Sequence, residues 1–547
     1  MKKRAVVHAI AFCSALVCAG CSNVSTSTAV GTSGAHAWTQ PGVLRISDIS
    51  DPSTLNPMLT GADVAYQLAS YTLEYLVQLD DRGELVPVLC ERIPTLENGD
   101  ISKDGLTVTY HLRRNVTWSD GQPFTAADVI ASWKQVMNPA NNVQIREGYD
   151  VVDRIDAPEP LTAVVHLKRP YAPLTTRFFA GVQEGPIAIM PAHVIDKLPE
   201  MNDVAFNSQP IGTGPFVVKS WQRNGKLIYE ANPHYWRGVP KLKEIIFQSQ
   251  PSDQTELIGL KTHELDADID ASIGLIPQYQ TLDGMRTTVT HSLRLTVGIM
   301  NAQGVLGDVR LRHAIIYALD RNSMLARLAH GAGYVADEYL PNWSWAHTAD
   351  VPRYPYDPKL SAATLDAAGW RLAPDGYRYK NGTRLQIVVI GVAGSTASHN
   401  FNTLVQSYLR AVGIDAIIKE FSYAVVFNIT GPIRQGRYDM ATYSYSVNYD
   451  PAALNDDGCD QFAPAGANEE RFCDPLVDRL ERQAMSTNDR AERLKLYRVI
   501  EKRRMEDLPA VPYYFRDRVS VFNEDLHGFT ASRGIIANWN AWQWSLP

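Results

Sequence analysis

Apolar and polar side chains alternate along two segments in the first third of the chain. In residues 106–112 an apolar side chain recurs at every second position, and a later segment repeats the pattern at Leu161, Ala163, Val165 and Leu167. An alternating segment buries one face of a strand and leaves the other face in water. The pattern therefore predicts half-buried strands of an antiparallel sheet.

A different pattern begins near residue 385. Residues 385–390 are almost continuously apolar, and a helical spacing follows at Phe401, Leu404, Val405, Tyr408 and Leu409. Gly413 then marks a helix exit, and residues 414–418 have the composition of another strand. Strand, helix and strand in this order predict a βαβ unit, whose parallel strands are buried on both faces.

Three other segments carry helical signals. Thr125 stands three residues before Asp128, which predicts a capping box at the start of a helix that runs toward Trp133. Helical patterns also cover residues 308–329 and 475–484. The chain thus combines a region of antiparallel character with a region of α/β character, and ligand sites favour the cleft between two such units.

Composition and charge narrow the class of protein. The chain has 547 residues, of which 45% are hydrophobic and 20% charged, which is typical of a globular protein with several domain-sized units. Its net charge of −7 argues against nucleic-acid binding, which needs a basic surface to neutralise phosphates. Beyond the amino terminus no segment reaches ~18 uninterrupted apolar residues, so we expect no other membrane span.

The amino terminus has the pattern of an export signal. Lys2, Lys3 and Arg4 precede an apolar run over residues 5–20, which is short for a membrane span. We therefore expect residues 1–20 to be a cleaved signal peptide, with an uncleaved anchor helix as the alternative.

Cys21 follows this run directly and resembles the acylated cysteine of a bacterial lipobox. Cys18 occupies the position where a lipobox usually has leucine. The two cysteines also match C-x-x-C, but no βαβ unit surrounds them, so a redox motif is not expected. Residues 21–39 are rich in small and polar side chains and predict a flexible tether.

Signatures of catalysis and of metal binding are absent. The chain has no G-x-S-x-G, H-E-x-x-H or G-x-x-x-x-G-K-[ST] motif. Residues 212–216 form a glycine-rich stretch that predicts a tight turn with positive φ rather than a phosphate cradle. Asp266, Asp268 and Asp270 have the spacing that opens a calcium loop, but Ala271 and Pro277 replace its required glycine and glutamate. We expect no catalytic residue, no metal and no cofactor.

Residues 118–129, with the sequence WSDGQPFTAADV, closely resemble the signature of the bacterial extracellular solute-binding proteins of family 5. That family includes the dipeptide, oligopeptide and nickel-chelate receptors of ABC importers. Other phrases typical of the family occur in the same order along the chain, and they lie at residues 53–57, 98–105, 212–216, 232–236, 309–314 with 318–321, 367–370, 437–439, 473–478 and 509–513.

The resemblance implies an α/β fold of the two-lobed periplasmic-binding-protein type (type II, cluster C-like), with the ligand enclosed between the lobes. We expect the first lobe to be discontinuous and to carry an extra subdomain at residues 83–209. The rest of lobe one is expected at residues 40–82, 210–294 and 509–547. Lobe two is expected at residues 295–508.

The resemblance also implies a function. The protein would be a monomeric, substrate-binding lipoprotein of an ABC importer, held at a bacterial membrane in the periplasm or on the cell surface. It would capture a small polar solute that is peptide-like, glycan-like or a chelate, and deliver it to the permease subunits. The alternatives are a solute-sensing receptor, a chaperone or a surface adhesin with the same fold; an enzyme on this scaffold would need a nucleophile or metal in the cleft.

The dipeptide receptors of the family have a cysteine pair just after an Asp-Pro segment, which here is Asp450-Pro451. The resemblance therefore implies a disulfide between Cys459 and Cys473, with two buried thiols as the alternative. Cys90 lies among apolar neighbours and predicts a buried free thiol.

Peptide-binding relatives hold the ligand's ammonium with an aspartate shortly before this Asp-Pro pair. The corresponding strand is one residue shorter here, so that the anchor position falls on Asn448 when counted forward and on Val447 when counted backward. Both are neutral, and a buried ammonium without a carboxylate loses its charge-assisted hydrogen bond. We therefore expect weak binding of peptides through a free amino terminus, unless Asp450 takes over the role.

Three tyrosines of the same segment are the other candidates for ligand binding. Tyr445 falls where relatives often place a cleft tryptophan, and Tyr443 and Tyr449 share its strand parity. Tyrosines stack on planar or sugar-like ligands while their hydroxyl groups form hydrogen bonds. The alternative is that these rings pack in the core on the hidden face of the strand.

Overall fold

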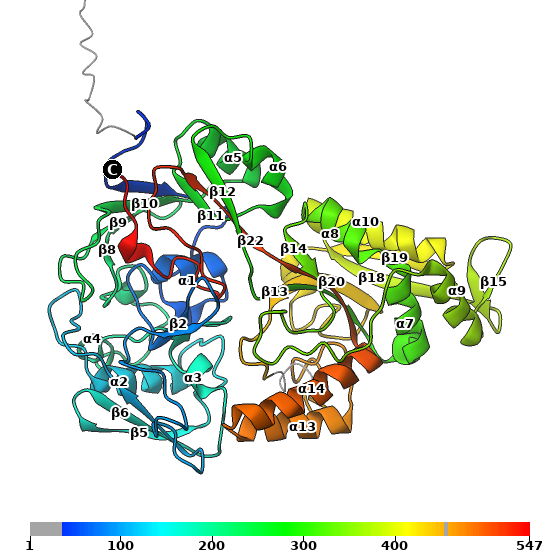
Figure 1. Cartoon of the computed structure of the whole chain (residues 1–547), viewed down its shortest axis with the longest axis horizontal. Coiled ribbons are helices and arrows are strands. Elements are labelled where there is room, and N and C mark those ends of the chain that lie inside the picture. The colour runs from blue at the N-terminus through cyan, green and yellow to red at the C-terminus, as the bar shows by residue number, and fades with distance from the viewer. Residues whose placement is uncertain (1–34, 453–457) are drawn as a thin grey trace, which may run out of the picture.

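Two mixed sheets, each with helices around it, lie at the centres of two lobes in the computed structural model (Figure 1). The structure describes residues 35–452 and 458–547. The predicted signal peptide, Cys21 and most of the expected tether therefore lie outside the described residues. Among the described residues, no helix combines the length and apolar character needed to cross a membrane.

The first lobe contains the seven-stranded sheet, whose order is β12-β22-β11-β1-β10-β9-β8. β1 pairs in parallel with β10 and β11, and the outer pairs are antiparallel. The strands are β1 (Val43–Ile46), β8 (Phe216–Trp221), β9 (Lys226–Ala231), β10 (Glu244–Gln248), β11 (Ala267–Ala271), β12 (Met285–Thr290) and β22 (Arg518–Asn523). Helices α1 (Asp63–Ala69), α5 (Asp253–Lys261) and α6 (Ile276–Tyr279) accompany them.

The second lobe contains the six-stranded sheet β14-β21-β13-β20-β18-β19. Its strands are β13 (Arg294–Met300), β14 (Gly333–Val335), β18 (Gln386–Val392), β19 (Asp415–Phe421), β20 (Met440–Ser446) and β21 (Ala510–Arg516). The predicted βαβ unit is confirmed: β18 and β19 pair in parallel, and α10 (Thr396–Ala411) joins them. Gly413 has a φ of 88°, a conformation that side-chain-bearing residues rarely adopt, and it ends the helix as predicted.

The region of alternating patterns folds as predicted. β4 (Thr107–His111) and β6 (Thr162–Leu167) pair antiparallel, with Val108 opposite Val165, and β5 (Val152–Glu159) extends this sheet. Thr125 and Asp128 form the predicted capping box of α2 (Ala126–Met137). A neighbouring small sheet consists of β2 (Val77–Leu79), β3 (Leu85–Pro87) and β7 (Ala180–Gly181), with the short helices α3 (Leu174–Arg177) and α4 (Ala192–Ile195) nearby.

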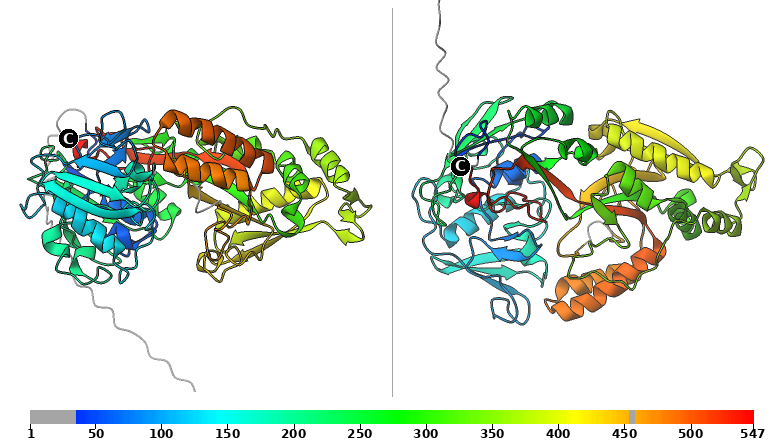
Figure 2. Two further views of the ribbon diagram at one scale, coloured as in Figure 1. Left: turned by 90° about the horizontal axis from the view of Figure 1, so that it is seen from below. Right: turned by 45° about the horizontal axis from the view of Figure 1, so that its top comes forward.

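Helices of the second lobe differ in one place from the prediction. The single helix expected over residues 308–329 is divided into α7 (Val309–Ala318) and α8 (Arg321–Leu328), because the Asp320 side chain caps a new helix by accepting from the Ser323 N–H. The helix expected over 475–484 is α13 (Pro475–Ser486), which packs beside α14 (Arg490–Asp507), as both views of Figure 2 show. The remaining elements are α9 (Pro358–Ala367), α11 (Tyr423–Val426) and the small sheet β15 (Arg371–Leu372), β16 (Arg378–Lys380) and β17 (Thr383–Arg384).

Two short connections join the lobes. One runs from β12 to β13 through residues 291–293, and the other runs from β21 to β22 through Asp517. The strand pairing differs here from the expected boundary at residue 509, since β21 lies in the sheet of the second lobe and β22 in the sheet of the first. The other expected domain limits stay predictions.

Gly212 and Gly214 do not form the predicted turn with positive φ. Neither has a positive φ. A Cβ atom on Gly212 would lie 1.8 Å from the backbone oxygen of Thr72, and one on Gly214 would lie 2.7 Å from the same oxygen. The glycines are therefore needed for close backbone packing, and the prediction of a turn with positive φ is wrong.

The structure contains the predicted disulfide between Cys459 and Cys473, with the two Cα atoms 4.8 Å apart. The predicted buried thiol of Cys90 is also confirmed. Burial raises the pKa of this thiol to about 12, so that it stays protonated and unreactive at neutral pH.

Candidate functional site

The turn that follows β20, residues 447–450, meets the other lobe at the segment 171–184. An Arg177 guanidinium nitrogen donates to Asn448 Oδ1 at 3.0 Å, and the Tyr449 backbone N–H donates to Gln183 Oε1 at 3.1 Å. Nearby, the Ala172 N–H donates to the Met485 carbonyl at 2.8 Å. These three hydrogen bonds, which we call the junction, connect the subdomain of the first lobe with the second lobe.

Asn448 lies at the junction with both ends of its side chain in use. Its oxygen accepts from Arg177, and its Nδ2 donates to the Ala452 carbonyl at 2.8 Å. Arg177 in turn lies 3.3 Å from a carboxylate oxygen of Glu147. The residue predicted to contact ligand thus also links the lobes; its contact with ligand stays a prediction.

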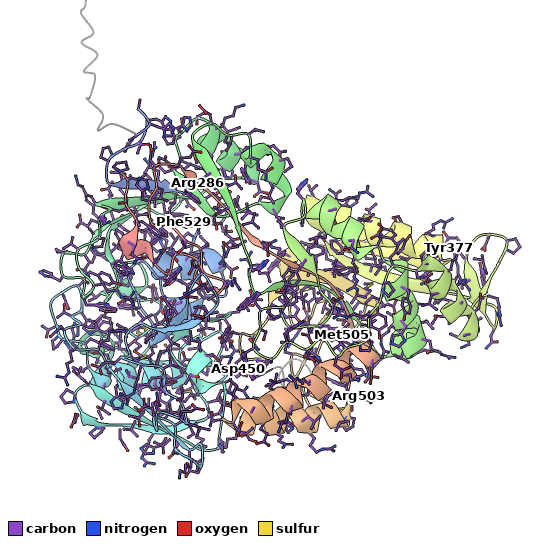
Figure 3. All side chains as sticks on the ribbon, viewed as in Figure 1. Arg286, Tyr377, Asp450, Arg503, Met505 and Phe529 are labelled. Atoms are coloured by element: carbon purple, nitrogen blue, oxygen red, sulfur yellow. A yellow bond between two sulfur atoms is a disulfide. The ribbon has the colours of Figure 1, made fainter. Side chains whose placement is uncertain are left out.

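Asp450 is buried in an ion pair within the second lobe (Figure 3). The Arg493 guanidinium donates to both carboxylate oxygens, to one of them at 2.7 Å. Burial opposes the charge on Arg493, but Asp450 more than offsets this and raises the pKa of the guanidinium. A ligand ammonium would have to displace Arg493 to reach Asp450, so this position is a weak substitute for the missing anchor carboxylate.

The three tyrosines have different surroundings. The Tyr443 hydroxyl donates to Glu469 Oε2 at 2.8 Å, and its ring meets Phe427 edge-on, so that it packs within the second lobe. Tyr445 is partly buried, with its ring centroid 6.1 Å from that of Tyr443. Tyr449 lies beyond the end of β20, where strand parity no longer applies. Their contact with ligand stays a prediction.

A further contact between the lobes, around Trp343, has no pattern in the sequence that predicts it. The Trp343 ring lies 6.4 Å from that of Tyr449, and the Arg533 guanidinium lies 5.4 Å from the Trp343 ring centroid. A Cβ on Gly83 would come within 2.8 Å of the same indole ring. Trp343 comes from a loop without periodicity, and its partners are distant in sequence.

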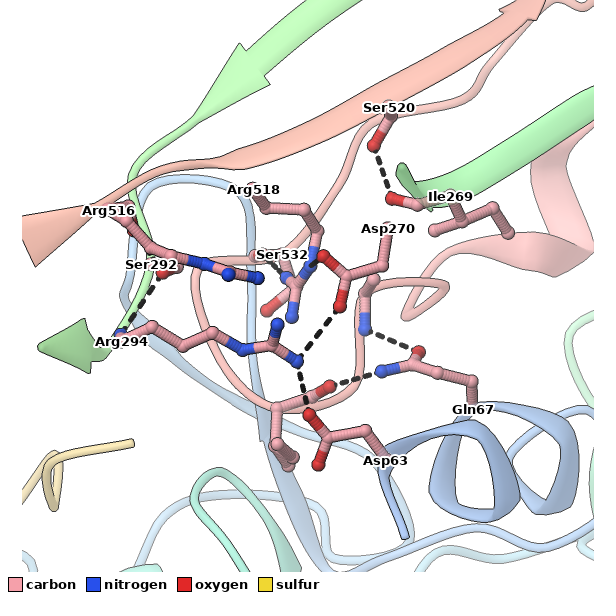
Figure 4. Close-up of polar contacts among 12 residues, drawn as sticks. Asp63, Gln67, Ile269, Asp270, Ser292, Arg294, Arg516, Arg518, Ser520 and Ser532 are labelled. Carbon is pink, nitrogen blue, oxygen red and sulfur yellow. Dashed lines mark hydrogen bonds and ion pairs between the residues drawn. The ribbon is translucent and has the colours of Figure 1, made fainter. Parts of the chain in front are cut away.

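Charged side chains gather where the two connections cross between the lobes (Figure 4). Arg294 begins β13 and forms ion pairs with Asp63, at the start of α1, and with Asp270 of β11, the latter at 2.9 Å. Burial raises the pKa of Asp270, but Arg294, Arg518 and Arg516 together hold it below its usual value. We call these three arginines and two aspartates the hinge cluster.

The other two arginines of the hinge cluster differ in their partners. Arg518 is 4% exposed and donates to the carbonyls of Ser532 at 2.6 Å and Gly534 at 3.1 Å. Arg516 is partly buried, and its Nε is shielded from water without a hydrogen-bond partner among the described residues. Burial, and then the charge of Arg294, lower the pKa of Arg516.

Three carboxyl groups lie behind the hinge cluster in the first lobe. Ser47 Oγ donates to Glu256 Oε1 at 2.8 Å, and Asp268 Oδ2 is buried. Burial raises the pKa of Glu256 to about 7 and that of Asp48 to about 6, and burial together with Glu256 raises the pKa of Asp268. Asp48 and Glu256 therefore release their protons at a higher pH than ordinary carboxyl groups do.

A separate cavity of about 620 Å³ lies in the second lobe, between β18, β19 and the segment 424–437. Apolar side chains line it together with Lys419 and Arg437. None of the predicted ligand-binding residues borders it.

Comparison with known proteins identifies the family to which this architecture belongs. The family model "Bacterial extracellular solute-binding proteins, family 5 Middle" matches residues 84–455. Protein XP55 of Streptomyces lividans is 28% identical over 515 residues, which cover 92% of this chain and 88% of that protein.

Two solved structures share the fold along almost the whole chain. NikA from Brucella suis, in complex with Fe(III)-EDTA, has a TM-score of 0.80 at 24% identity and covers 92% of this chain and 100% of its own. The oligopeptide-binding protein AppA from Bacillus subtilis, in complex with a nonapeptide, has a TM-score of 0.77 at 21% identity, with coverages of 93% and 100%. The chain belongs to the bacterial extracellular solute-binding proteins of family 5.

Proposed function

We propose that this protein captures a small polar solute between its lobes and delivers it to the permease of an ABC importer. The observation that carries the proposal is how the lobes are joined: among the described residues two short connections link them covalently, and they also meet at the hinge cluster, at the three hydrogen bonds of the junction and around Trp343. Such a construction lets the lobes open and close about the connections.

Closure would follow from the ligand's own contacts. Each junction hydrogen bond contributes only about 1 kcal/mol net, so the closed form is held weakly without ligand. A solute that contacts both lobes favours the closed form by its difference in affinity for the two forms. The importer would then recognise the closed, loaded protein.

The proposed solute is polar or aromatic, with a peptide blocked at its amino terminus as the next choice. The family's relatives include proteins that bind a nonapeptide and a metal chelate. Here the ammonium anchor position is neutral at Asn448 or Val447, and Asp450 is occupied by Arg493. Ordinary peptides would lack their anchor, whereas Tyr445 and Tyr449 offer rings for stacking.

The first test measures closure directly. Small-angle scattering and thermal unfolding of the mature protein are recorded with a library of di- and tripeptides, with its amino-acetylated counterpart and with oligosaccharides. We expect compaction with a ligand of the proposed class, and about 2.7 kcal/mol of added stability at a hundredfold excess over Kd. Sub-micromolar binding of free peptides that vanishes on amino-terminal acetylation would contradict the proposed ligand class, and release of a chemically altered product would contradict the transport function.

The second test concerns the membrane anchor, which we propose to be a lipid on Cys21. A Cys21→Ser variant should leave the membrane fraction or accumulate as an unprocessed precursor, because the acylated side chain is gone. Cys90→Ser is the matched control and should stay anchored. A Cys21→Ser protein that is processed and still sediments with membranes refutes the anchor.

A further inference from the structure

The Arg516 guanidinium has no hydrogen bond and no ion pair to any described residue, although its Nε is buried. The aspartates of the hinge cluster are already engaged: Arg294 binds Asp63 and Asp270, and Arg518 lies 3.9 Å from Asp270. A buried cation without a partner is costly, because it loses water and gains no compensating bond.

The charges around Arg516 add to this cost. Three guanidinium groups converge in the hinge cluster, as Figure 4 shows, whereas only two carboxylates lie among them. Glu184 also interacts with Arg294, and its pKa is raised mainly by burial. Both aspartates of the cluster are engaged by the other two arginines, so Arg516 is the guanidinium without a carboxylate partner among the described residues.

The position of Arg516 is open to a ligand. It ends β21 at the connection between the lobes and remains partly exposed, in contrast to Arg518. Asp63, an aspartate of the hinge cluster that pairs with Arg294, has a side chain that is 39% exposed. An anion that reaches Arg516 displaces no hydrogen-bond or ion-pair partner of its guanidinium among the described residues.

We propose that Arg516 binds a carboxylate group of the captured solute at the hinge. A planar guanidinium forms two parallel hydrogen bonds to a carboxylate, and a single negative charge supplies the counter-charge that Arg516 lacks. A dianionic phosphate fits less well, because Asp63 and Asp270 would repel its second charge. The inference rests on the proposed function and names a chemical group that the solute must carry.

The test compares wild type with Arg516→Gln and Arg516→Lys, and with Arg371→Gln as the control at an arginine whose side chain is 73% exposed. The probes are a library of amino-acetylated dipeptides as free acids and the same library as carboxyl-terminal amides. Solutes that remain bound to the purified wild-type protein are extracted, methyl-esterified and weighed by mass spectrometry.

Wild type and Arg371→Gln should prefer the free acids to the amides by at least about 10-fold, which is the scale of a lost charge-assisted pair. Arg516→Gln should lose this preference, and Arg516→Lys should keep part of it. The empty Arg516→Gln protein should unfold at the same temperature as wild type or higher, because an unpaired buried charge is gone. A merely structural arginine would instead give a less stable empty protein with unchanged selectivity.

Three results overturn the inference while the proposed function stands: equal binding of acids and amides by wild type, an unchanged preference in Arg516→Gln, or a retained solute without a carboxyl group. Stronger binding of inorganic phosphate than of the acids, lost in Arg516→Gln, would replace the carboxylate by a phosphate. If wild type binds no probe and retains no solute, the proposed function fails and this inference fails with it.

Discussion

Two sets of buried charged groups, one in each lobe, are matched differently. In the second lobe, two buried arginines have carboxylate partners: Arg493 binds both oxygens of Asp450, and Arg378 binds Asp366 at 2.9 Å together with the carbonyls of Val412 and Trp370. In the first lobe, Glu256 and Asp268 lie close together and have raised pKa values. The two arginines are neutralised by their partners, whereas the carboxyl pair changes its protonation near neutral pH.

The contrast indicates which part of the molecule responds to a change in pH or charge. The carboxyl groups of Glu256 and Asp268 lie without a counter-charge among the described residues, behind the hinge cluster, where the lobes turn against each other. The ion pairs of Arg493 and Arg378 hold segments within the second lobe. Three experiments test this difference, from the largest expected effect to the smallest.

Asp450→Asn should destabilise the second lobe most. The substitution keeps the size of the side chain but leaves the buried Arg493 without a counter-charge, at a cost of about 3–5 kcal/mol. Denaturant unfolding measures this cost. Asp350→Asn is the control, because Asp350 is 82% exposed and pairs with Lys502 on the surface, so that less than about 1 kcal/mol is expected. An equal, small effect of both variants would remove the contrast between the lobes.

Stability of the first lobe should fall as the pH rises from about 5 to 8. The folded protein holds protons on Glu256 up to a pKa of about 7 and on Asp48 up to about 6, whereas the unfolded chain releases them near pH 4. Folding therefore takes up protons in this range, and a higher pH disfavours it.

Glu256→Gln should flatten this pH dependence, with a gain over wild type of about 1–3 kcal/mol at pH 8 and little difference at pH 5. Thermal unfolding across the range is the measurement. Glu264→Gln, at an exposed position after the same helix, should leave the slope as it is in wild type. A slope as steep as that of wild type in Glu256→Gln would show that the carboxyl group of Glu256 does not titrate as described.

The junction should give the smallest effect. Gln183→Ala removes the acceptor of the Tyr449 N–H, a hydrogen bond between the lobes, at a cost of about 1 kcal/mol. The free energy of unfolding of this variant should change little, but the ligand-free variant should give the scattering curve of a more open particle than wild type. Gln435→Ala, which removes a hydrogen bond inside the second lobe, is the control and should leave the scattering curve unchanged. Identical curves for both variants would mean that the junction does not hold the lobes together.

Local patterns predicted local structure well. The capping box at Thr125, the pairing of β4 with β6 and the βαβ unit ending at Gly413 depend on neighbours in sequence, and all three are present. The division between α7 and α8 could have been predicted too, because Asp320 followed by Ser323 is a capping signal within the apolar pattern.

The candidate site depends on contacts that no local pattern contains. Arg294, Arg516 and Asp63 come from three distant parts of the chain and meet only after both connections are in place. The same holds for the Tyr443 hydroxyl, whose partner Glu469 lies beyond the end of the strand. The resemblance to the family predicted the fold and the disulfide, but the state of each side chain required the three-dimensional arrangement.

The position of β22 has a consequence for how the protein reaches its compartment. This strand lies between β12 and β11, although it is formed by residues 518–523, near the carboxyl terminus. During synthesis the first lobe lacks an interior strand of its sheet until the whole second lobe, which precedes β22 in the chain, has emerged from the ribosome. A chain that passes through a narrow translocation channel in an extended form benefits from such an arrangement, because the early strands of the first lobe cannot complete their sheet until β22 is present.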